Sequence, residues 1–106
     1  MKWYKFDVDY FLDATQGLSN DEELAYRRLI DAYYITEERL PAKTAELMEL
    51  TGVSQEVTLF VIGKFFKMTK EGWRDEAIDY AIGKHQQQVR INREIGKRGG
   101  RPKRST

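Results

Sequence analysis

The segment Leu50-Thr51-Gly52-Val53-Ser54 decides the predicted fold, because it ends one helix and begins the next. Gly52 is suited to the left-handed conformation that terminates a helix, which glycine adopts at little cost. Ser54 can then accept a hydrogen bond from an amide in the first turn that follows. The sequence therefore predicts a helix over about 42–51, a tight turn, and a helix from Ser54 to about Phe66, which together form a helix-turn-helix.

The residues before this segment predict an extended arm and a first long helix. Residues 2–6 are rich in aromatic side chains that partly alternate with polar ones, which is typical of a short strand or arm. Ser19 and Glu22 are spaced as a capping box, so we expect a helix over about 20–36. Pro41 is expected in the first turn of the next helix, where its missing amide hydrogen leaves nothing unpaired.

The residues after the helix-turn-helix predict a β-hairpin and a last helix. Residues 67–74 alternate around a turn at Gly72, and Asp75 can cap the helix that follows. The apolar stripe of that helix is expected to weaken beyond Val89, and the glycines at 96, 99 and 100 are expected to end regular structure. We expect a mainly α (α+β) fold with the element order of a winged-helix domain over 1–83, and a basic helical extension with a flexible tail over 84–106.

Charge is distributed unevenly between these two parts. Residues 1–83 carry 10 Lys or Arg against 16 Asp or Glu, whereas residues 84–106 carry 8 against 1. The overall net charge of +1 thus conceals an acidic body and a basic C-terminal segment. Basic residues that neutralise phosphates release condensed counterions, so such a segment favours nucleic acid as the partner.

The basic segment contains a Gly100-Arg101-Pro102 core that is similar to an AT-hook, whose extended backbone lies in the minor groove. Arg98 is separated from Arg101 by two glycines, so phosphate binding is favoured over A·T selectivity. A solvated terminus without a target is the competing interpretation. The residues expected to contact nucleic acid here are Arg90, Arg93, Lys97, Arg98, Arg101, Pro102, Lys103 and Arg104.

Two further places in the predicted domain are candidate DNA contacts. The second helix of the helix-turn-helix carries Glu56 and only one basic residue, so core packing of Phe60, Val61, Phe65 and Phe66 is favoured over base readout. The hairpin is the better auxiliary contact, because Lys67, Lys70 and Arg74 surround Trp73. Inward packing of Trp73 is the alternative.

Catalytic and cofactor chemistry find little support in the sequence. Asp7, Asp9 and Asp13 are expected to serve turns or caps rather than a metal. His85, the only histidine, has no accompanying nucleophile motif, and the chain has no cysteine. We expect no enzyme, no cofactor and no metal, and, since no membrane span or signal peptide is recognisable, a cytoplasmic protein.

Several short motifs occur in an order and spacing that resembles the YdaU-type domain of phage and prophage proteins, whose function is unknown. The resemblance covers roughly residues 3–83, and it implies a winged-helix-like fold, a link to phage DNA replication, a basic Gly-Arg-Pro extension and a bacterial host cytoplasm. It supplies no binding residues. The motifs are Trp3-Tyr4, Phe6, Asp9-Tyr10, Leu18-Ser19, Glu22, Ala25-Tyr26-Arg27-Arg28-Leu29-Ile30-Asp31, Leu40-Pro41, Leu50-x-Gly52-Val53-Ser54, Lys64-Phe65-Phe66 and Gly72-Trp73.

Two functional hypotheses follow. The first is a DNA-binding accessory protein of phage type that acts in replication and holds duplex DNA mainly through its basic C-terminal segment. The second is a protein-interaction module that docks a helicase, a loader or a repressor, or forms a homodimer through the last helix, with the tail as an electrostatic tether. RNA in place of DNA also stays open.

Overall fold

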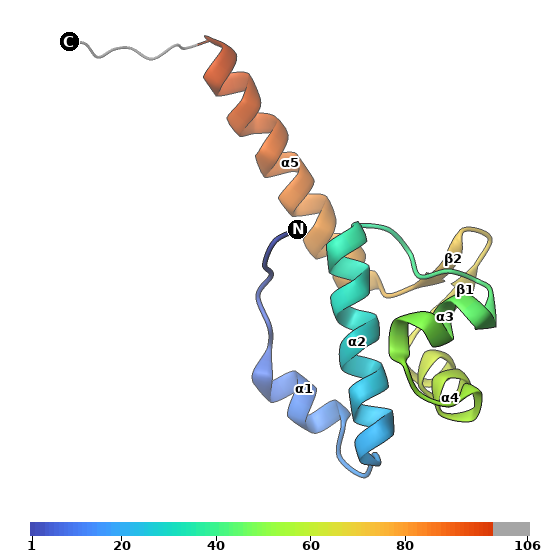
Figure 1. The fold of residues 1–106 in the computed structure, drawn as a ribbon. Coiled ribbons are helices and arrows are strands. Elements are labelled where there is room, and N and C mark those ends of the chain that lie inside the picture. Colours follow the sequence, from blue (N-terminus) through green and yellow to red (C-terminus); the bar gives the residue numbers. More distant parts are fainter. Residues whose placement is uncertain (99–106) are drawn as a thin grey trace.

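The computed structural model describes residues 1–98, and within them helix α2 (Asn20–Thr36) runs through the middle of the body (Figure 1). Helices α3 and α4 pack on one side of α2, and the N-terminal arm and α1 lie on another. The mainly helical fold with a small hairpin and a long C-terminal helix is confirmed. The other elements are α1 (Val8–Ala14), α3 (Thr44–Thr51), α4 (Gln55–Phe65), β1 (Lys67–Thr69), β2 (Gly72–Arg74) and α5 (Glu76–Arg98).

Helix α2 begins where the sequence predicts it. The Glu22 amide donates to Ser19 Oγ at 3.2 Å, and the Ser19 amide donates to Glu22 Oε1 at 2.8 Å, so the capping box is complete. Its buried side chains recur at intervals of three and four residues, which places one apolar face against the rest of the core. They are Ala25, Tyr26, Leu29, Ile30 and Tyr33.

The turn between α3 and α4 has the predicted geometry. Gly52 has φ 71°, and Ser54 Oγ accepts from the Val57 amide at 3.2 Å. The buried hydroxyls of Thr51 and Thr58 lie 2.8 Å apart and join the two helices. This bond satisfies two polar groups that would otherwise be costly to bury between the helices.

The prediction for Pro41 is wrong, because α3 begins at Thr44 with Lys43 at its cap. The preceding residue, Leu40, pairs with Trp73 of β2 through two backbone hydrogen bonds of 2.9 Å each. This pairing holds the chain extended at the point where the helix was expected to start. Leu40 therefore forms an isolated β-bridge beside the two-stranded hairpin.

Gly72 begins β2 rather than forming the turn, which falls at Lys70 and Glu71. Its φ is 117°, and a Cβ added there would lie 2.1 Å from the Leu40 carbonyl oxygen. Only glycine fits this close approach. Trp73 packs against the core, so the alternative of inward packing is confirmed. Its indole nitrogen is buried and has no hydrogen-bond partner among residues 1–98.

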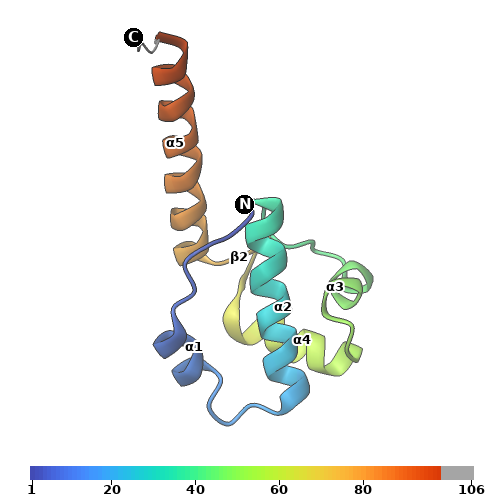
Figure 2. The same ribbon diagram turned by 60° about the vertical axis from the view of Figure 1, so that its left-hand side comes forward.

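Helix α5 is the longest element and projects away from the body (Figures 1 and 2). Its first turn is capped by Asp75, whose Oδ1 accepts from the Ile78 amide at 3.0 Å. The helix passes through Gly96, the first of the three glycines expected to end it, and reaches Arg98, whereas Gly99 and Gly100 lie outside the described residues. A glycine within a helix costs only about 1 kcal/mol, which does not suffice to end it.

The N-terminal arm lies alongside α2 (Figure 2). The Tyr4 ring stacks on Tyr34 with centroids 3.9 Å apart, and the Tyr4 hydroxyl donates to Asp31. Arg27 lies over the Phe6 ring at 4.2 Å. These contacts fix an otherwise extended segment to the surface of the body.

Candidate nucleic-acid interface

The distal half of α5 carries four of the basic residues predicted to contact nucleic acid, which are Arg90, Arg93, Lys97 and Arg98. The proximal half is anchored in the core by Ile78 and Ile82, which are 6% and 5% exposed. Further along, Gln86 Nε2 donates at 3.1 Å to Oε1 of Glu37, the residue at the C-cap of α2. Beyond this contact every residue up to 97 is exposed.

Arg90, Arg93 and Lys97 are spaced by three and four residues, which places them on one face of α5. All three are exposed, and within residues 1–98 none of them forms an ion pair. Arg98 is the last residue of the helix. We refer to Arg90, Arg93 and Lys97 as the basic face of α5.

A shallow hollow of about 440 Å³ at the start of the basic face is bordered by Glu37, His85, Val89 and the two arginines. Glu37 is engaged elsewhere, because its Oε2 lies 3.1 Å from the amino group of Met1. This bond and the one from Gln86 lower the pKa of Glu37. His85 lies half-buried on the apolar stripe between Ile82 and Val89.

The other predicted contact residues fall in two groups. Arg101, Pro102, Lys103 and Arg104 lie outside the described residues. On the hairpin, Lys67 and Lys70 are exposed. Arg74 is engaged by the body, since its Nε donates to Asp79 Oδ2 at 3.1 Å.

Asp79 is the centre of a polar network that ties the hairpin to α2 and α5. It accepts from the Tyr33 hydroxyl and from Arg74, and Arg39 Nη2 lies 3.9 Å from its Oδ2. Arg39 also donates to Glu71 Oε1 at 2.6 Å. Burial, together with the bond to Asp79, raises the pKa of Tyr33 to about 12. The network orients the hairpin, but the charge of Arg74 is paired with Asp79 and is therefore less available to DNA.

Helix α4, which occupies the position of a recognition helix, presents a face poorly suited to DNA. Its exposed side chains include Glu56, Leu59, Phe60 and Lys64, of which only Lys64 is basic. Phe60 is 49% exposed, so its expected place in the core is wrong. Val61 and Phe66 are buried, and Phe65 stacks on Tyr26 with centroids 3.8 Å apart, as the packing hypothesis expected.

Of the three acidic residues expected to serve turns or caps near the N-terminus, Asp7 has a capping role. Asp7 caps α1, because its Oδ1 accepts from the Tyr10 amide at 2.9 Å. Within residues 1–98 no group of three or more His, Cys, Asp or Glu is arranged to hold a metal ion. None of the helices in this described part is long and apolar enough to cross a membrane.

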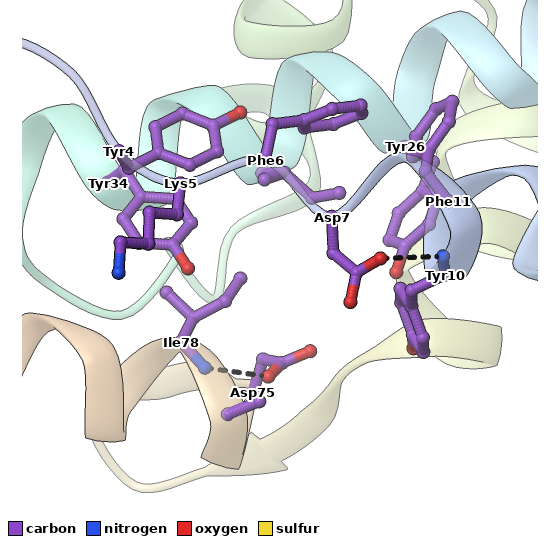
Figure 3. A pocket seen from close by; sticks show the side chains of 12 residues that line it. Tyr4, Lys5, Phe6, Asp7, Tyr10, Phe11, Tyr26, Tyr34, Asp75 and Ile78 are labelled. Carbon is purple, nitrogen blue, oxygen red and sulfur yellow. Dashed lines mark hydrogen bonds between the residues drawn. The ribbon is translucent and has the colours of Figure 1, made fainter.

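A pocket of about 310 Å³ opens between the N-terminal arm, α2 and the start of α5 (Figure 3). Its walls are largely aromatic, and the carboxylates of Asp7 and Asp75 both border it. Burial and the charge of Asp75 raise the pKa of Tyr34. This pocket was not predicted from the sequence. The aromatic residues concentrated in the arm were the one local pattern that could have indicated it. The aromatic lining residues are Tyr4, Phe6, Tyr10, Phe11, Tyr26 and Tyr34.

A family model described as "Protein of unknown function (DUF1376)" matches residues 2–82. The chain belongs to the DUF1376 family. The match ends within the proximal half of α5, so the basic face lies beyond the DUF1376 region. No curated protein and no solved structure matches the chain. A domain of unknown function is thus shown, and the finer link to phage proteins stays a hypothesis.

Proposed function

We propose that this DUF1376 protein is a nucleic-acid-binding accessory protein that holds duplex DNA through the basic face of α5 and the C-terminal segment that follows. The observation that carries the proposal is the exposure of Arg90, Arg93 and Lys97 on one face of a projecting helix. Side chains with this freedom can reach phosphates without first breaking contacts within the protein. Continuous basic helices are an established way of entering the major groove.

Charge supports a polyanionic partner for this half of the helix. Residues 84–98 contain five basic residues and a single acidic one, Glu94. Two copies of the distal helix placed side by side would therefore repel each other, which disfavours a homodimer through it. The phosphate backbone of DNA has the opposite sign and a regular spacing. Contacts of this kind give affinity with little sequence selectivity.

The proposed setting is phage or prophage DNA replication. It rests on the resemblance of residues 3–83 to the YdaU-type domain. In this setting the winged-helix-like body orients the protein, and Lys67 and Lys70 on the hairpin add auxiliary phosphate contacts. Arg74 would add a phosphate contact only if DNA displaced Asp79 from its guanidinium group.

The experiment compares two triple variants of equal charge. In the first, Arg90, Arg93 and Lys97 are replaced by Gln; in the control, Lys2, Lys43 and Lys64 are replaced by Gln on exposed parts of the body. Binding to a labelled duplex is measured over a salt series. The first variant is expected to reduce the log–log salt slope by about 3, because each lost phosphate contact contributes about 0.9.

The control should change the log–log salt slope by less than about 0.9, which is the contribution of one phosphate contact. Equal loss in both variants would show that only total charge matters and would refute the assignment to α5. Absence of binding by the parent at low salt would refute the proposal altogether. The same titration with duplex RNA distinguishes the two nucleic acids.

A protein-interaction module is the second candidate, and the outward face of α4 favours it. Leu59 and Phe60 are 40% and 49% exposed there, at a position where a DNA reader would carry polar and basic side chains. Exposed apolar side chains of this size are common at protein interfaces. Leu59→Ser with Phe60→Ser should leave DNA binding unchanged and abolish capture of a replication protein if this candidate holds.

A further inference from the structure

The aromatic pocket of Figure 3 is separate from the basic face of α5 and has its own chemistry. Its volume of about 310 Å³ is at the lower end of the range for small-ligand sites. Figure 3 shows Tyr4 and Tyr34 on one side of the pocket and Phe11 and Tyr26 on the other. The site is therefore shaped for one flat or slender group rather than for a large ligand.

Two carboxylates border the opening. Asp7 and Asp75 come from the starts of α1 and α5, and Figure 3 shows them on facing sides of the pocket. Each uses its Oδ1 to cap a helix, accepting from Tyr10 and Ile78 respectively. Within residues 1–98 neither carboxylate forms an ion pair, so both Oδ2 atoms are available to a ligand.

The charge around the pocket is negative. Lys5 is the basic residue among those lining it, and in Figure 3 its amino group extends away from both carboxylates. Burial raises the pKa of Tyr26 and of Tyr34, and the negative charge of Asp75 acts in the same direction on both. Negative potential combined with aromatic walls is the environment that stabilises an organic cation.

We propose that this pocket binds a guanidinium group, the planar cationic head of an arginine side chain or of a free alkylguanidine. A guanidinium presents several N–H donors in one plane, which suits two carboxylates approaching from different sides, and its flat faces stack on tyrosine rings. The compact, strongly hydrated ammonium group of lysine gains less from such walls. This site goes beyond the proposed DNA contacts, because none of the basic-face residues lines it.

The test uses the full chain labelled with nitrogen-15 and three probes: butylguanidine, the capped peptide acetyl-Gly-Arg-Gly-amide, and the same peptide with citrulline. Citrulline has the size of arginine but carries a neutral urea. The amides of Tyr10 and Ile78, which donate to the two carboxylates, are the reporters. We expect saturable shifts of both amides with the arginine peptide and none with the citrulline peptide.

Charge is tested with Asp7→Asn combined with Asp75→Asn. Asparagine caps a helix as well as aspartate does, so the fold is kept while the charges are lost. We expect affinity for the arginine peptide to fall roughly tenfold for each carboxylate. The matched control is Asp9→Asn combined with Asp13→Asn, which makes the same charge change on exposed positions of α1 outside the pocket and should have little effect.

Each outcome either supports a guanidinium site or overturns it. Binding of butylguanidine as tight as that of the peptide identifies a free guanidine as a sufficient ligand, and tighter peptide binding identifies an arginine of a polypeptide. Equal shifts with citrulline, equal loss in the control, or no shift at either reporter would overturn the proposal. The variant with Arg90, Arg93 and Lys97 replaced should bind the arginine peptide unchanged, which separates this result from the fate of the DNA proposal.

Discussion

Replacing Asp79 by Asn should destabilise the protein by about 2–3 kcal/mol. Asp79 accepts from the Tyr33 hydroxyl and from Arg74 Nε, and both bonds involve its charge. The amide of Asn keeps one acceptor oxygen, so one charge-assisted bond worth about 1.5–3 kcal/mol is lost. The attraction to Arg39 and Arg74 adds less than about 1 kcal/mol, because these side chains are 30% and 31% exposed.

Urea unfolding followed by circular dichroism measures this change directly. A loss of 2 kcal/mol should also lower Tm by roughly 10 °C in a domain of this size. Asp13→Asn is the control, since Asp13 is exposed on α1 and its carboxylate makes no hydrogen bond within residues 1–98. Arg74→Gln should cost a similar amount, and the double variant less than the sum. Additive losses, or a loss below about 0.5 kcal/mol for Asp79→Asn, would refute the network.

Three further perturbations test the rest of the body, each by urea unfolding. Thr58→Val should cost about 1–2 kcal/mol because it strands the buried Thr51 hydroxyl, whereas replacing both threonines by Val should be nearly neutral. Gly72→Ala should prevent folding or lower the free energy of unfolding by more than about 3 kcal/mol, since the new Cβ would lie 2.1 Å from a carbonyl oxygen. Gly63 on α4 has open space around it, so Gly63→Ala should instead raise the free energy of unfolding by about 0.5–1 kcal/mol. Stability should fall between pH 10 and 12, because the pKa of Tyr33 is about 12 in the folded state and near 10 in the unfolded state. The unfolded protein loses this proton first as the pH rises, which favours unfolding. Tyr33→Phe should flatten this decline.

The sequence was sufficient where structure depends on residues close together in the chain. Ser19, Ser54 and Asp75 each cap a helix through an amide three residues away, so a short motif contains the whole interaction. Gly52 likewise ends α3 through its own backbone conformation. These four positions set the starts of α2, α4 and α5 and the end of α3, and the structure confirms them.

The errors have a common origin in contacts between distant parts of the chain. Pro41 was misplaced because Leu40 pairs with Trp73, a contact that no local pattern contains. Phe60 was assigned to the core because α4 is apolar on most of its circumference, so periodicity does not identify the face that packs. The pocket between Asp7 and Asp75 escaped notice for the same reason, since the two residues meet only through the fold.

The separation of charge between the body and α5 makes the proposed DNA contact compatible with an acidic protein. At 1.5 Å per residue, Arg90 lies about 12 Å along the helix from Ile82, the last buried residue of α5. This exceeds the Debye length of about 8 Å at physiological salt, so most acidic groups of the body are screened from DNA held at the basic face. At 0.01 M salt the Debye length is about 30 Å, and the body should then repel the DNA. The log–log salt dependence is therefore expected to flatten at low salt, and truncation of the acidic body should restore its linearity.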